Sequence, residues 1–188
     1  MRIGILGGSF DPIHNGHIEL AATAKYKCNL NKIIFVPLNI PWLKKYETLA
    51  NSDDRIKMCE LAIMKYDSFE CSEVDIKRGG TTYMIDTVRD LKNSLKGENS
   101  FSIIIGDDNL ENIKEWKNYN ELRKMTEIIV APRKYENKKK DPNFKYIEFK
   151  RVLVSSSKIR KDIKNNSDWE NFVPETVKNY INKNNLYK

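Results

Sequence analysis

Short apolar runs alternate with amphipathic stretches along the chain. A short, fully apolar run is typical of a buried strand, whereas apolar residues spaced three and four apart predict a helix that faces a core. Strands are predicted at residues 2–6, 32–36, 101–105 and 127–131, with an extended segment at 69–76 and a short last strand at 146–149. Helices are predicted at 16–27, from an N-cap at Ser52, and at 84–95, 155–164 and 174–182.

This alternation favours βαβ units. We therefore expect an α/β, Rossmann-like fold, which is an open, mostly parallel sheet with helices on both faces, followed by a small C-terminal helical extension at about 155–188. The polar segment 134–143 is interpreted as a solvated loop. Because neither a repeat nor a linker divides the sequence, we expect residues 1–188 to form one domain.

The composition supports a water-soluble protein with its own core. The chain has 188 residues, of which 40% are hydrophobic, and no apolar run approaches the roughly 20 residues of a membrane-spanning helix. The first apolar run stops at glycines, so a signal peptide is not expected. The three cysteines show no CxxC spacing, which argues against a disulfide framework or a zinc site and favours a cytoplasmic location.

The net charge of +7 suits several kinds of partner, namely nucleic acid, a membrane surface or a small polyanion. The chain is also rich in Lys and Asn together, a pairing that biased base composition can produce without any function. Basic residues are spread through the chain and aromatic residues fall at unrelated spacings, so we expect neither nucleic acid nor membrane as partner. A basic nucleic-acid-binding module stays open as the alternative from another class, and the oligomeric state is left undetermined.

Unusual residues gather where the predicted strands end. In an open parallel sheet, ligands bind at the carboxyl ends of strands beside the switch point in strand order. The segments that follow predicted strands, or precede the penultimate helix, are Gly7–His17, Pro37–Lys44, Lys77–Thr82, Gly106–Asn109, Pro132-Arg133 and Ser155–Ser157.

Both histidines of the chain lie in the segment GGSFDPIHNGH, at His14 and His17. Glycines after a buried strand let the backbone approach a ligand, and the start of the next helix offers N–H groups to phosphate. Neither a G-x-G-x-x-G fingerprint nor a Walker A sequence is present. A metal site would need more ligands than the local Asp11 supplies. Phosphate binding is therefore the favoured interpretation, with a ligand-free tight turn as the alternative.

Other segments have two interpretations each. The run Ser155–Ser157 is either a second anion site, helped by Arg160, or an ordinary capped helix. A carboxylate at Asp107 or Asp108 accepts ribose hydroxyls or caps a helix. Trp116 either stacks on a planar ring or belongs to the core.

Taken together, these segments resemble the bacterial nicotinate-nucleotide adenylyltransferase family, within the nucleotidyltransferase superfamily marked by an H-x-G-H motif. The matching segments are GGSFDPIHNGH, DDRIKM with its Arg55, EVDIKRGGTTYMIDT, IIIGDDNLENIKEW, VAPR, VSSSKIR and VPETVKNYINKNNLY. They run in family order over nearly the whole chain. There are departures: the lid motif P-P-H-K is here Pro41-Trp42-Leu43-Lys44, Ser157 replaces the usual Thr, and an acid follows Gly106 where a small residue is more usual.

The resemblance implies transfer of AMP from ATP to nicotinate mononucleotide, giving deamido-NAD and pyrophosphate, with Mg²⁺ bound mainly through ATP phosphates rather than by a protein metal site. The catalytic residues it implies are His14, His17, Lys44 and Arg160. The residues implied to bind ATP are Gly8, Ser9, Phe10, His14, His17, Gly106, Asp108, Ser156, Ser157 and Arg160. The residues implied to bind the mononucleotide are Thr82, Tyr83, Trp116 and Arg133.

Three alternatives within nucleotide binding remain open. Phosphopantetheine adenylyltransferases share the G-S-F-D-P start but typically have Thr in place of His14. Nicotinamide mononucleotide is a nearer competitor as substrate, because backbone groups decide which pyridine is accepted. A catalytically inactive nucleotide-binding regulator is disfavoured by the presence of His14, His17 and Arg160.

Overall fold

The structure is a computed structural model that describes residues 1–42, 48–106, 110, 112–132, 141–149 and 152–188. Four residues with predicted roles lie outside the described part of the chain, and those roles stay predictions: Lys44, Asp107, Asp108 and Arg133. Residues 134–140 of the predicted loop also lie outside it.

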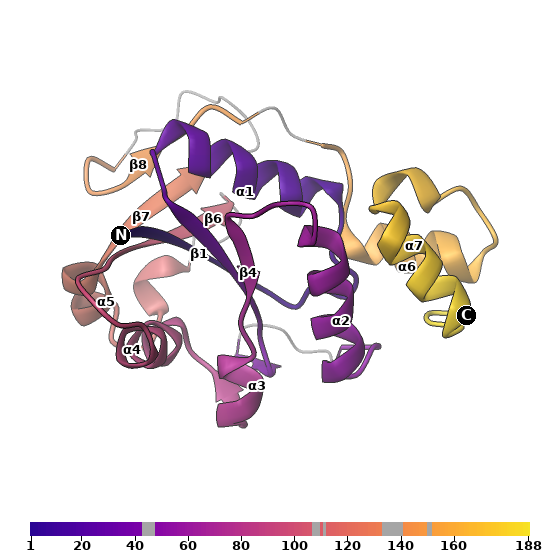
Figure 1. The fold of residues 1–188 in the computed structure, drawn as a ribbon, viewed down its shortest axis with the longest axis horizontal. Coiled ribbons are helices and arrows are strands. Elements are labelled where there is room, and N and C mark those ends of the chain that lie inside the picture. Colours follow the sequence, from indigo (N-terminus) through magenta and orange to yellow (C-terminus); the bar gives the residue numbers. More distant parts are fainter. Residues whose placement is uncertain (43–47, 107–109, 111, 133–140, 150–151) are drawn as a thin grey trace.

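A six-stranded parallel sheet forms the centre of the molecule (Figure 1). Its strands are β1 (Arg2–Gly8), β2 (Lys32–Pro37), β4 (Phe69–Cys71), β6 (Ser100–Gly106), β7 (Thr126–Ala131) and β8 (Lys145–Tyr146). Their spatial order is β4-β2-β1-β6-β7-β8, and every neighbouring pair is parallel. Two short strands, β3 (Ile40–Pro41) and β5 (Thr81–Thr82), pair separately. The predicted parallel sheet is confirmed.

Helices cover both faces of this sheet (Figure 1). They are α1 (Asn15–Lys27), α2 (Ser52–Ile63), α3 (Val74–Arg78), α4 (Met84–Ser94), α5 (Tyr119–Met125), α6 (Ser156–Lys164) and α7 (Glu175–Lys183). Successive strand residues point to opposite faces, so Phe35 packs with α1, α2, α6 and α7, while its neighbours Ile34 and Val36 pack with α4 and α5. The strands are apolar on both sides for this reason.

The C-terminal helices are fastened to the N-terminal half. Helix α7 packs against α2, the Thr176 hydroxyl donates to the Leu61 carbonyl at 2.8 Å, and the Tyr180 hydroxyl donates to Asp54 at 2.8 Å. Burial and the Asp54 bond raise the pKa of Tyr180 to about 12, so its hydroxyl stays a donor at neutral pH.

Several local features differ from the prediction. Residues 74–78 form helix α3 rather than an extended segment, because Asp75 and Arg78 pair across one helical turn at 2.6 Å. Helix α5 was missed, since Leu122 is its one fully buried side chain and leaves almost no periodic signal. The last strand is β8, Lys145–Tyr146, rather than 146–149.

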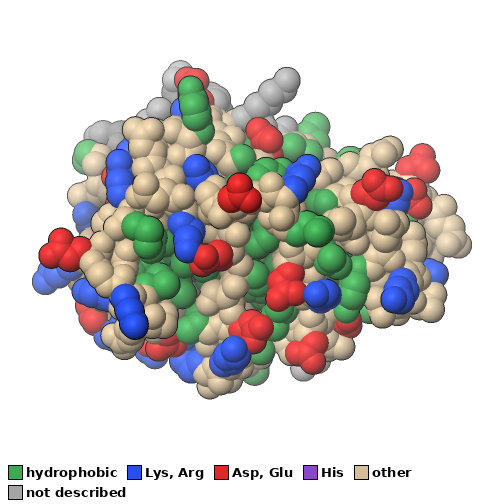
Figure 2. All heavy atoms as spheres, viewed as in Figure 1, with side chains coloured by type: hydrophobic (Ala, Val, Ile, Leu, Met, Phe, Trp, Pro, Cys, Tyr) green, Lys and Arg blue, Asp and Glu red, His purple; other side chains and the backbone are tan. Residues whose placement is uncertain are grey.

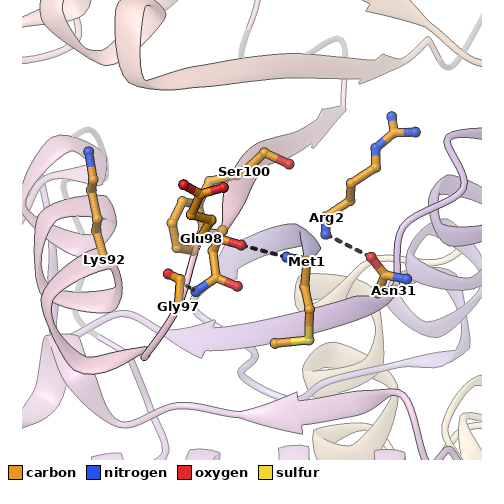
Figure 3. Close-up of a pocket in the computed structure, with 9 residues that line it drawn as sticks. Met1, Arg2, Asn31, Lys92, Gly97, Glu98 and Ser100 are labelled. Atoms are coloured by element: carbon orange, nitrogen blue, oxygen red, sulfur yellow. Dashed lines mark hydrogen bonds between the residues drawn. The ribbon is translucent and has the colours of Figure 1, made fainter.

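A hollow of about 680 Å³ lies at the amino-terminal edge of the sheet. Figure 3 shows two hydrogen bonds between residues that line it: the Met1 ammonium donates to the Glu98 carbonyl at 2.7 Å, and the Arg2 N–H donates to Asn31 at 2.7 Å. These bonds fasten the start of β1 to the segments that precede β6 and β2. We assign this edge a structural role.

Acidic and basic side chains are interspersed on the face shown in Figure 2, so the excess positive charge is not gathered there. Within the described residues, no helix has both the length and the apolar character that crossing a membrane requires.

The N-cap of α2 gives a test of the fold at one residue. The sequence favoured Ser52, but the Asn51 side chain is the acceptor, taking the Asp54 N–H at 2.8 Å. We expect Asn51→Ala to lower the free energy of unfolding by about 1 kcal/mol. Urea denaturation measures this, with Ser52→Ala as the matched control. A larger loss from Ser52→Ala would contradict the assignment.

Candidate active site

A cavity of about 550 Å³ opens at the carboxyl-terminal edge of the sheet. The chain leaves β1 in one direction, to β2 and β4, and later returns to build β6, β7 and β8 on the other side. The strand order therefore reverses between β1 and β6, where an α/β sheet binds ligands. Gly7 of β1, Gly106 of β6 and Ala131 of β7 line the cavity. A cavity therefore lies where the sequence predicts the site.

His14 and His17 meet at the start of α1. His14 is the N-cap and His17 is the third helical residue, so the two rings stack with centroids 3.7 Å apart. The His14 main-chain N–H donates to Nδ1 of His17 at 3.2 Å. Because Nδ1 accepts this bond, the proton of a neutral His17 ring lies on Nε2. Both histidines line the cavity, and the Nε2–H of a neutral His17 is a hydrogen-bond donor.

A second helix start, that of α6, meets the same cavity. Ser155 caps α6 by accepting the Lys158 N–H at 3.2 Å, and the Ser156 hydroxyl donates to the Pro12 carbonyl at 2.9 Å. Gly16 allows this close approach, since a Cβ there would meet Val154 and the His14 ring at 3.1 Å. Two helix N-termini that face one space favour an anion.

The glycine-rich loop is supported from beneath by Arg55, which is 2% exposed. Its guanidinium donates to the carbonyls of Ser9 and Leu38 at 2.9 and 2.8 Å. Phe10 has φ +48° and turns its ring into the core, edge-on to His17 at 5.0 Å. A Cβ at Gly8 would lie 3.1 Å from the Phe10 ring, so the glycine permits this turn.

Asp11, only 3% exposed, is held from several sides. Its carboxylate accepts the N–H groups of Leu49 and Ala50 at 2.9 and 3.1 Å and the Tyr187 hydroxyl at 2.8 Å. The Arg160 guanidinium donates to the Asp11 main-chain carbonyl at 2.6 Å and lies 3.7 Å from the carboxylate. A buried carboxylate needs such partners to be tolerated.

An aromatic residue, Trp116, and a polar residue, Thr82, also line the cavity. Trp116 lines it, is 9% exposed, and its Nε1 has no hydrogen-bond partner among the described residues. Thr82 also lines it, but its hydroxyl accepts the Asn39 N–H at 2.9 Å, while the Asn39 side chain donates to the Gly80 carbonyl at 2.9 Å. Thr82 therefore joins two loops, and Trp116 lines the cavity while its Nε1 is buried.

Among the residues that line the cavity, Trp42, Asp75 and Met84 were given no binding role from the sequence. Trp42 packs on Tyr83, with ring centroids 6.2 Å apart, and could have been found as the residue that departs from the lid motif. Asp75 accepts bonds from Thr87 and Arg78, yet burial raises the pKa of its carboxyl. No sequence signal marked it, because its burial depends on packing between α3 and α4.

The predicted site residues thus divide into three groups. Those that line the cavity are His14, His17, Thr82, Gly106, Trp116, Ser156 and Ser157. Those placed beside it, without lining it, are Gly8, Ser9, Phe10, Tyr83 and Arg160. The third group, Lys44, Asp108 and Arg133, lies outside the described residues.

A protein-held metal has little to bind here. In the described part of the chain, no three His, Cys, Asp or Glu side chains are grouped as a metal site would require. Asp11, an acid close in sequence to the histidines, uses its carboxylate oxygens to accept bonds from Leu49, Ala50 and Tyr187.

Comparisons with known proteins assign the family. A sequence model described as cytidylyltransferase-like matches residues 5–162. A Dehalococcoides mccartyi protein named "Probable nicotinate-nucleotide adenylyltransferase" is 35% identical over 198 residues, which cover 100% of this chain and 97% of the relative. A protein of the same name from Borreliella burgdorferi is 38% identical over 189 residues, with the same coverage. This chain belongs to the nicotinate-nucleotide adenylyltransferase family.

Solved structures agree with the fold of this nucleotidyltransferase family. The Plasmodium falciparum nicotinic acid mononucleotide adenylyltransferase complexed with NaAD has a TM-score of 0.77 and 22% identity, covering 99% of this chain and 97% of that one. The same enzyme complexed with APC has a TM-score of 0.76 at 22% identity, covering 99% and 96%. The Rossmann-like fold expected from the sequence is confirmed.

The Thr82 bond gives a prediction on the architecture of the cavity. Thr82→Val keeps the shape but leaves the Asn39 N–H without its acceptor, so we expect a loss of about 1–3 kcal/mol in unfolding free energy. Thr82→Ser keeps the acceptor and should lose clearly less. Urea denaturation of both variants checks this, and equal losses would show that the hydroxyl does not fasten the two loops.

Proposed function

We propose that this protein transfers AMP from ATP to nicotinate mononucleotide, giving deamido-NAD and pyrophosphate. The observation that carries the proposal is one cavity in which two helix starts, with His14 and His17, face an end that holds Trp116. The first part suits a polyphosphate and the second suits a planar ring. The names borne by the full-length relatives support the choice of nucleotides.

In the proposed reaction, an oxygen of the mononucleotide phosphate attacks the α-phosphorus of ATP. The bond between the α-phosphorus and the oxygen that bridges it to the β-phosphate breaks, and pyrophosphate leaves. No enzyme nucleophile is required, so catalysis consists of positioning and charge stabilisation. Nε2–H of His17 donates to the phosphate that gains charge, and its Nδ1 is held by the His14 N–H. The N–H groups at the start of α6, near Ser156 and Ser157, receive the β- and γ-phosphates.

The remaining residues are given roles by position. Gly106 leaves open space at the end of β6, which suits adenosine. Trp116 lines the cavity and is given the role of stacking on the pyridine end. Phe10 is buried, so we assign any ATP contact there to the main chain.

The roles that we propose from family likeness alone are those of Gly8 and Ser9 toward ATP, Arg160 and Lys44 toward the phosphates, Asp108 toward adenosine, and Tyr83 and Arg133 toward the mononucleotide.

Mg²⁺ is proposed to enter with ATP, held by phosphate oxygens and water. Bound in this way, it offsets negative charge on the triphosphate. Small molecules are the proposed substrates, and we expect a cytoplasmic enzyme with neither nucleic acid nor a membrane as partner.

The direct test measures pyrophosphate release with ATP and Mg²⁺, supplying nicotinate mononucleotide, nicotinamide mononucleotide or phosphopantetheine in parallel. We expect release with nicotinate mononucleotide, together with deamido-NAD in equal amount. Release with phosphopantetheine only, or with none of the three, would overturn the proposal.

His17→Ala should lower kcat at least roughly a hundredfold, the scale of losing one transition-state donor. Glu19→Ala, on the exposed face of the same helix, is the matched control and should retain wild-type activity. Near-full activity of His17→Ala would leave the histidine with a structural role only.

Gly106→Val should raise the KM for ATP by at least roughly tenfold, because the new side chain enters the proposed adenosine space, an overpacking that costs about 1–3 kcal/mol. Its melting temperature should be near that of the wild type, since no atom of the described residues lies within 4 Å of a Cβ there. Ser100→Val, at the other end of β6, is the control. An unchanged KM for ATP would show that adenosine does not bind beside Gly106.

A further inference from the structure

The C-terminal tail reaches the active-site loop through one side chain, that of Tyr187. Its hydroxyl donates to Asp11 Oδ1 at 2.8 Å, across 176 positions of the sequence. Tyr187 has φ +68°, a left-handed conformation that bulky residues rarely adopt. A strained backbone that persists next to a binding loop points to a contact that holds it.

Asp11 joins the elements that surround the proposed triphosphate site. Its Oδ2 takes the Leu49 N–H, just after the lid segment, and its Oδ1 takes the Ala50 N–H and the tyrosine hydroxyl. Arg160 of α6 binds the main-chain oxygen of the same residue at 2.6 Å, while its distance to Oδ2 is 3.7 Å. The guanidinium thus lies beside the carboxylate without a close hydrogen bond to it.

Removal of one of the hydrogen-bond donors to Asp11 would change which groups bind its carboxylate. A buried carboxylate that loses a hydrogen bond draws the nearest cation to itself, and here that cation is Arg160. The tyrosine is a dependable donor, because burial and the neighbouring Asp11 raise its pKa well above the ordinary value.

We propose that Tyr187 is a positioning residue for the triphosphate of ATP: by occupying Oδ1 of Asp11, it keeps Arg160 from being drawn onto the carboxylate and so within reach of the phosphates. The proposal rests on the proposed adenylyltransferase function for the identity of the nucleotide and for the contact of Arg160 with its phosphates. Tyr187 acts through Asp11 and Arg160 and touches neither substrate, so its removal should affect ATP and leave the mononucleotide alone.

The chain offers a matched control. Tyr180, on α7, donates to a carboxylate of the N-terminal half in the same way, at 2.8 Å to Asp54, but away from the cavity. Tyr180→Phe and Tyr187→Phe each remove one hydroxyl that joins the C-terminal part to a buried or half-buried acid. A role in stability alone would give the two variants the same kinetic behaviour.

The experiment compares the wild type, Tyr187→Phe, Tyr180→Phe, Arg160→Met and the double variant Tyr187→Phe/Arg160→Met. We expect Tyr187→Phe to raise the KM for ATP about tenfold, the scale of one hydrogen bond to a charged group. Its KM for nicotinate mononucleotide should stay unchanged, and Tyr180→Phe should behave as wild type. In the Arg160→Met background, Tyr187→Phe should have no further effect.

The proposal is overturned if Tyr187→Phe binds ATP as the wild type does, if both KM values rise together, or if the two substitutions are additive. Calorimetric titration of ATP into each folded variant, checked by thermal melting, gives the same comparison without turnover. A protein that binds ATP in this pattern but makes no deamido-NAD would refute the proposed function and leave the role of Tyr187 supported.

Discussion

The order of strands in the sheet is the constraint on which the site depends. Since the chain builds outward from β1 to β2 and β4, and then crosses to β6, the connections leave neighbouring strands in opposite directions. The edge between them cannot be covered by either connection, so a cavity remains there. Gly7 and Gly106 line this cavity, and a larger side chain at either position would occupy part of its space.

The helix starts convert that cavity into an anion site. Helix α1 begins directly after the glycine-rich loop, and α6 is brought to the same place by bonds between Ser156 and Pro12 and between Arg160 and Asp11. Each helix start carries unsatisfied N–H groups and partial positive charge. The positive character at this point therefore comes from backbone and histidine donors placed by the fold, whereas the net charge of +7 is spread over the chain.

The sheet, the first helix and the general place of the site could be predicted because they depend on local patterns. Apolar runs such as FSIII mark buried strands, and a glycine-rich segment that precedes a helix marks a phosphate loop. Asp75 could not be assigned to the cavity, since its burial depends on packing between α3 and α4. The orientation of Phe10 was also hidden in the sequence: a positive φ accompanies a ring that is turned into the core.

Long-range pairs were equally invisible in the sequence. The tyrosine at position 187 and the aspartate at position 11 lie at opposite ends of the chain, and only the packing of α7 on α2 brings them together. The C-terminal segment resembled the family in sequence, but that resemblance gave no indication of which residues it contacts. The structure supplies that contact, and with it a physical reason for the C-terminal part to matter to ATP.

A crystal structure with a non-hydrolysable ATP analogue tests the central claim most directly. The account predicts the triphosphate between the starts of α1 and α6, with Nε2 of His17 within hydrogen-bond distance of a phosphate oxygen. A triphosphate at the amino-terminal edge of the sheet, beside Met1 and Lys92, or one at the cavity that His17 does not contact, would contradict it.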